Sequence, residues 1–162
     1  MSKWKGLFET AFRGFEEVDE LEMDFRFYDP ASTVDIKILE GSKRLQLTED
    51  LKSMFLEFDG ISVKEKYWGS KNLYLPISEV IGDVEDYIVN SGNPMPPETE
   101  LNSVVFFAQQ NGYAVLYGMC CRSFGLFEVG QVLALDHETG EFEVESATLE
   151  EFVGNSWHCG LS

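Results

Sequence analysis

The sequence is poor in positive charge, and its few bases are confined almost entirely to its first part. Its 162 residues hold 12 Lys and Arg against 29 Asp and Glu, a formal net charge of −17. From Asn72 to the end, Arg122 is the only base, so that part carries about −13. An acidic surface repels phosphate, so we expect no direct binding to nucleic acid. It also speeds association with a basic protein, although solubility alone is an equally good reason for such charge.

Cysteine and histidine are also scarce, with three Cys and two His in the chain. Cys120 and Cys121 are adjacent and Cys159 makes the number odd, which favours free thiols in a reducing compartment. The "CC" and "HC" pairs lack the two-residue spacer of zinc sites. The motifs of serine hydrolases, phosphate-binding loops, zinc proteases and dinucleotide-binding proteins are absent. We therefore expect no metal, no cofactor and no enzymatic activity. The opposing hypothesis, a hydrolase or metal enzyme, needs His137 or His158 to meet a cysteine and an acid.

Long hydrophobic runs are missing as well. No run approaches the roughly 20 apolar residues of a membrane span, and the first 17 residues contain no apolar signal-peptide core. These absences predict a cytoplasmic protein that does not bind membranes. The composition is nevertheless that of a folded protein, with 44% hydrophobic residues and 13 Phe. The length suits one domain over residues 1–162.

The hydrophobic periodicity changes along the chain from helical to strand-like. Residues 2–17 carry an apolar stripe at helical spacing, and Ser32 and Thr48 stand where N-caps begin two further helices. Strand-like runs then flank the turn Asn111-Gly112 and recur over residues 132–146. A short closing helix follows. This order predicts the α+β class: a single domain with a mostly antiparallel sheet packed with N-terminal and C-terminal helices.

The stretch "VLALDHETGEFEVES", residues 132–146, concentrates acidic side chains. Neighbouring residues of a strand point to opposite faces, so Asp136 and Glu138 share a face that excludes His137. "DHETGE" fits a turn between two strands. In the second strand, Phe142 and Val144 are expected to face the core while the glutamates between them face water. The stretch therefore predicts a hairpin with an acidic outer face.

Two kinds of residue are candidates for binding a protein partner. The charged contacts are assigned to the hairpin: Asp136, Glu138, Glu141, Glu143 and Glu145. Trp68 and Phe124 are candidate anchors, because interface hot spots favour aromatic side chains, although both also suit a core.

Ordered motifs over residues 28–157 resemble the SUKH superfamily in its Smi/Knr-type branch. They are "DPASTVDIKILEGSKRL", "LTEDLKSMFLEFDG", "VVFFAQQNGYAVLYG" and "VLALDHETGEFEVESATLEEFV", followed by Trp157. Ile36 and Glu40 match the family's "I-x-x-x-E" pattern. The chain departs from the family at Leu47-Thr48, where the family has "LP", and at Tyr113-Ala114, where it has a glycine and an acid.

The resemblance implies a non-enzymatic protein of mostly one domain. Bacterial members of the family are immunity proteins of polymorphic or contact-dependent toxin systems, which bind a cognate toxin, often a nuclease, and neutralise it. Fungal members are regulatory interaction proteins of cell-wall signalling. The implied partner is a basic toxin domain, and the alternative is an intracellular regulatory or scaffold protein. For Glu40 we expect a role in the fold.

Overall fold

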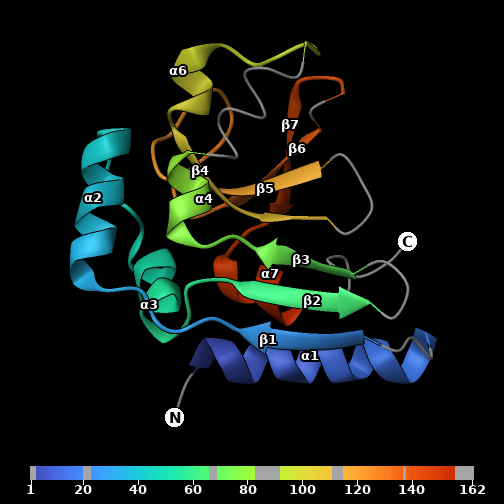
Figure 1. Ribbon diagram of the computed structural model, residues 1–162. Coiled ribbons are helices and arrows are strands. Elements are labelled where there is room, and N and C mark those ends of the chain that lie inside the picture. Colours follow the sequence, from blue (N-terminus) through green and yellow to red (C-terminus); the bar gives the residue numbers. More distant parts are fainter. Residues whose placement is uncertain are drawn as a thin grey trace.

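The computed structural model describes residues 3–19, 23–65, 69–82, 92–110, 115–136 and 138–155 (Figure 1). Seven strands form one antiparallel sheet in sequential order. They are β1 (Met23–Phe27), β2 (Ile61–Glu65), β3 (Gly69–Tyr74), β4 (Val104–Gln109), β5 (Val115–Cys120), β6 (Val132–Asp136) and β7 (Glu141–Ser146). The helices are α1 (Lys3–Asp19), α2 (Thr33–Lys43), α3 (Glu49–Glu57), α4 (Ile77–Ile81), α6 (Glu98–Leu101) and α7 (Leu149–Gly154). The predicted α+β class is confirmed.

Helices α1 and α7 pack side by side against the same face of the sheet, which we call the α7 face. The ring of Phe8 in α1 contacts those of Phe25 and Tyr74 in the sheet. Phe152 in α7 contacts Tyr74 and Tyr117. These rings belong to one hydrophobic core, so the N-terminal and C-terminal helices stabilise the same sheet.

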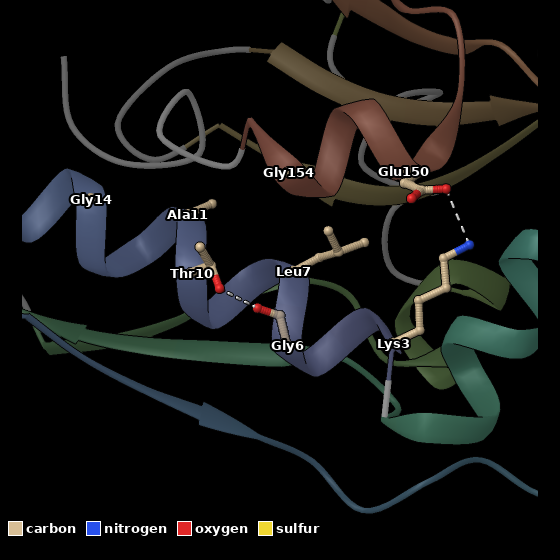
Figure 2. A pocket seen from close by; sticks show the side chains of 8 residues that line it. All are labelled: Lys3, Gly6, Leu7, Thr10, Ala11, Gly14, Glu150 and Gly154. Atoms are coloured by element: carbon tan, nitrogen blue, oxygen red, sulfur yellow. Dashed lines mark hydrogen bonds and ion pairs between the residues drawn. The ribbon is translucent and has the colours of Figure 1, made fainter. Parts of the chain in front are cut away.

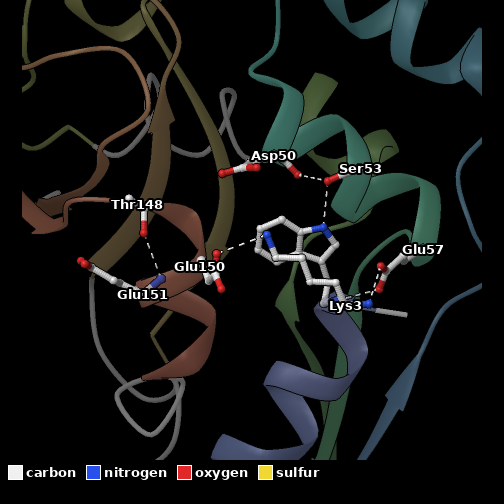
Figure 3. Close-up of polar contacts among 8 residues, drawn as sticks. Lys3, Asp50, Ser53, Glu57, Thr148, Glu150 and Glu151 are labelled. Atoms are coloured by element: carbon white, nitrogen blue, oxygen red, sulfur yellow. Dashed lines mark hydrogen bonds and ion pairs between the residues drawn. The ribbon is translucent and has the colours of Figure 1, made fainter. Parts of the chain in front are cut away.

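The start of α1 is tied to both neighbouring helices by side chains (Figure 3). The indole N–H of Trp4 donates a hydrogen bond to Ser53 Oγ in α3 at 2.8 Å. The ammonium of Lys3 pairs with Glu150 of α7 at 3.2 Å. Because Trp4 is almost fully buried, its N–H needs such a partner.

The two N-caps predicted from the sequence are present. Ser32 accepts a hydrogen bond from the amide of Asp35, whose carboxylate accepts one in return, which completes a capping box. Thr48 caps α3 through the amide of Leu51. Glu40 has the structural role that we expected, because it accepts a hydrogen bond from the amide of Leu47 and pairs with Lys52.

Other elements differ from the sequence-based expectation. The three prolines of residues 90–100 predict a surface loop, whereas the described part of this segment ends in helix α6, with Pro97 at its N-cap. The helical spacing of Ile81, Val84 and Ile88 predicts a helix that opens at Ser78. Helix α4 begins one residue earlier, at Ile77, and Val84 and Ile88 lie outside the described residues. The turn Asn111-Gly112 lies outside them as well, while its flanking strands β4 and β5 pair as predicted. Within the described residues, no helix has the length and apolarity that crossing a membrane requires.

Candidate protein-binding surface

The turn between β6 and β7 is built by Asp136 and Gly140. A carboxylate oxygen of Asp136 accepts a hydrogen bond from the amide of Glu138 at 2.9 Å, and its carbonyl accepts one from the amide of Gly140 at 2.7 Å. Gly140 has φ +75°, and a Cβ there would lie 2.6 Å from the carbonyl oxygen of Pro94. Asp136 therefore shapes this turn, which agrees with the hairpin interpretation of the sequence.

The strand register places three carboxylates of the hairpin on the α7 face. Asp136 lies opposite Glu141, and Ala134 lies opposite Glu143. Ala134 in turn lies opposite Tyr117, whose ring packs against α7. Because directly opposed residues share a face of the sheet, Asp136, Glu141 and Glu143 all project from the α7 face. This arrangement confirms the expected clustering for these three residues.

Glu145 departs from the strict alternation. It is the extra residue of a β-bulge, because the partners of Val144 and Ser146 are adjacent residues of β6. Burial raises the pKa of the Glu145 carboxyl, and the charge of Glu143 raises it further. The bulge therefore keeps this carboxylate beside the others. We call Asp136, Glu138, Glu141, Glu143 and Glu145 the acidic hairpin.

The charge of the acidic hairpin is not neutralised by bases of the described chain. No described residue forms an ion pair with Glu138, Glu141, Glu143 or Glu145. Arg122 is the one base of the later sequence, and its guanidinium donates to the carbonyl of Arg44 at the end of α2. The four exposed glutamates thus present uncompensated negative charge to solvent.

An exposed apolar tip lies on the opposite face of the sheet. Phe124 and Phe127 exchange backbone hydrogen bonds across a two-residue turn, in which Gly125 has φ +53°. The residue at the tip, Leu126, is 95% exposed. Leu126 is not among the anchors predicted from the sequence, although "FGLF" between strands is a signal for such a turn.

Phe124 itself is only partly exposed. Its ring centroid lies 5.1 Å from that of Phe127 and 5.4 Å from that of Phe142 in β7. It therefore supports the turn under Leu126, and Leu126 is the more accessible anchor. The other proposed anchor, Trp68, lies outside the described residues.

Val144 was expected in the core and is 48% exposed. Val144 lies opposite Leu133 and on the same face as Phe142, as the alternation predicted. It is half-exposed because β7 is the last strand of the sheet, so no further described strand lies beside it. Val129, in the loop that follows the Leu126 turn, is 54% exposed. Leu126, Val129 and Val144 are therefore three exposed apolar side chains of this part of the chain.

The thiols within the described residues are poor nucleophiles. Burial raises the pKa of Cys121 to about 12, and burial also raises the pKa of Cys120. A thiol that stays protonated at neutral pH neither attacks a substrate nor ligates a metal readily. In the described part of the chain, no group of three or more His, Cys, Asp or Glu residues is placed to hold a metal ion. His137, His158 and Cys159 lie outside that part.

A groove of about 690 Å³ runs between α1 and α7 (Figure 2). Its walls are mostly small residues, and at Gly6, Gly14 and Gly154 a Cβ would meet no neighbouring atom. The ion pair of Lys3 and Glu150 is its main charged feature. The hydroxyl of Thr10 donates to the carbonyl of Gly6, so it is already satisfied. The groove therefore presents no set of groups suited to acid–base or nucleophilic chemistry.

No protein-family model matches the chain, and a search of curated proteins finds no match either.

Proposed function

We propose that this chain is a non-enzymatic binding protein of the immunity type, which neutralises a basic toxin domain by covering its basic surface. Membership of the SUKH superfamily, suggested by the ordered motifs, is part of the same proposal. The observation that carries it is the acidic hairpin, whose exposed glutamates lack ion-pair partners in the described chain.

A toxin that cleaves nucleic acid must hold phosphates with basic side chains, and an acidic protein occupies the same groove with complementary charge. Such complementarity raises the association rate and lowers affinity for acidic bystanders. Charge at the rim of an interface contributes little lasting affinity, so apolar side chains on the opposite face of β7, first Val144, supply the surface to be buried.

The test is co-expression in bacteria with the C-terminal domain of whatever large protein is encoded next to this one. Rescue of growth and a 1:1 complex after purification are the expected results. Toxicity without rescue or complex formation would overturn the immunity role and favour the regulatory or scaffold alternative.

Charge reversal locates the surface. The double variant Glu141→Lys/Glu143→Lys is expected to slow association at least tenfold and to flatten its dependence on ionic strength. Asp29→Lys/Asp50→Lys is the matched control, because it changes the net charge equally at exposed positions, one between β1 and α2 and one in α3, away from the acidic hairpin. Equal effects of the double variant and the control on the salt dependence would remove the acidic hairpin from the interface.

A further inference from the structure

The outer edge of β7 is open along the described chain. Strand β7 is the last of the sheet, and its six residues pair only with β6 among the described residues. Such an edge presents a row of backbone N–H and C=O groups that an extended peptide can pair with. Strand β1, at the other edge, runs alongside α1 in Figure 1, whereas no helix lies along β7 there.

The two faces of β7 differ in chemistry. On the α7 face it presents Glu141 and Glu143, and on the opposite face Phe142 and Val144. The half-exposed Val144 adjoins Phe142, on which the turn carrying Leu126 packs. A strand added to β7 would therefore place alternate side chains against carboxylates and the others beside apolar groups.

A second copy of the chain is a poor occupant of this edge. Pairing β7 with β7 of another molecule would bring two sets of unneutralised glutamates together, between molecules of net charge −17 each. Like charges opposed across strands are destabilising. Charge complementarity instead selects a strand with bases at alternate positions.

We propose that β7 binds an extended segment of the basic partner by strand addition, with Lys or Arg facing Glu141 and Glu143. The intervening residues of that segment are apolar and bury Val144 and Leu126. Backbone hydrogen bonds hold the segment, and the alternation of charge and apolar surface sets its register. This inference rests on the proposed function and states how that function is carried out.

The test uses a six-residue peptide of alternating lysine and valine, the length of β7, titrated into the isotope-labelled protein. Chemical-shift changes in the NMR spectrum are expected at the amides of β7 and of residues 124–129. The same peptide with every backbone nitrogen methylated keeps its charge but loses all its backbone donors. It is expected to bind at least tenfold more weakly.

Side-chain variants test the apolar contact. Leu126→Ser is expected to weaken binding of the alternating peptide about fivefold, since one exposed leucine loses its burial on binding. Val34→Ser on α2 is the matched control, because Val34 is also an exposed apolar residue, at 61%. It is expected to leave the affinity unchanged.

Three results would overturn strand addition: no binding of the lysine–valine peptide, shift changes spread over the acidic surface rather than β7, or equal binding of the N-methylated peptide. The two proposals fail separately. Toxin rescue that is insensitive to β7 and Leu126 variants would refute only the strand addition. Peptide binding at β7 without any toxin rescue would refute only the immunity role.

Discussion

The carboxylate of Glu57 accepts a hydrogen bond from the backbone amide of Trp4 at 2.9 Å, and so holds the start of α1 against the end of α3. The amides of Lys3 and Lys5 donate to the same carboxylate (Figure 3). The first amides of a helix have no partner within the helix, and a carboxylate also complements the positive end of its dipole. A residue more than fifty positions away in the sequence thus caps the first described amides of α1.

Replacing Glu57 should therefore loosen α1. Glu57→Ala leaves three amide donors without their partner and is expected to lower the free energy of unfolding by about 2 kcal/mol. Glu57→Gln keeps an acceptor oxygen but loses the charge, so its loss should be smaller. Urea unfolding followed by circular dichroism measures both. If Glu57→Ala lowers the free energy of unfolding no more than Glu57→Gln does, water replaces the carboxylate as the acceptor for these amides.

The contact between Gly140 and the Pro94 backbone predicts an intolerant turn. Gly140→Ala must adopt a positive φ and also displace the Pro94 carbonyl, so we expect a loss of about 2–3 kcal/mol. Gly125→Ala is the control, because Gly125 also has a positive φ but open space around its Cβ. It should lose about 1 kcal/mol. Equal losses of stability for the two variants in thermal unfolding would mean that the positive φ alone destabilises them and that the contact with Pro94 does not.

The raised pKa values of Asp59 and Glu145 should increase the free energy of unfolding of the protein as the solution is made mildly acidic. Burial raises the pKa of Asp59 above its ordinary value of 3.8, despite the hydrogen bond that it accepts from the amide of Ile77. The pKa of Glu145 is raised too. The folded state then binds protons more tightly than the unfolded state, so unfolding becomes harder as pH falls through the folded pKa values. The gain levels off below the unfolded values.

Asp59→Asn tests this pH dependence. The amide oxygen can still accept from Ile77, while the buried charge is removed, so the variant should be more stable than the wild type at pH 7. The difference should shrink as pH falls toward 4. Asp35 affects the stability in the opposite direction, because hydrogen bonds from Ser32 lower its pKa. Its contribution to the free energy of unfolding is therefore lost when the pH falls further and its carboxylate is protonated. Urea unfolding at several pH values checks the sign, and a difference that grows on acidification would refute it.

Local signals in the sequence were sufficient for some features and not for others. The caps at Ser32 and Thr48 depend on residues within one turn, so the sequence alone predicted them. The alternation of β7 was predicted as well, which placed Glu141 and Glu143 on one face. The exposure of Val144 was not, because it depends on β7 being the last strand, and strand order is set by the whole chain. The remote cap supplied by Glu57 has no local signal either.

The charges of β7 should prevent its edge from pairing with itself. Glu141→Gln/Glu143→Gln removes the repulsion while keeping a polar side chain at each position, and it leaves the half-exposed Val144 on an open edge. Such an edge promotes association, so the double variant is expected to form dimers or larger species at concentrations where the wild type does not. Asp29→Asn/Asp50→Asn changes the net charge equally at exposed sites away from β7 and should behave like the wild type. Sedimentation velocity over a range of concentrations distinguishes them. Equal association of both double variants would assign the effect to net charge, and association of neither would show that the glutamates are not what protects this edge.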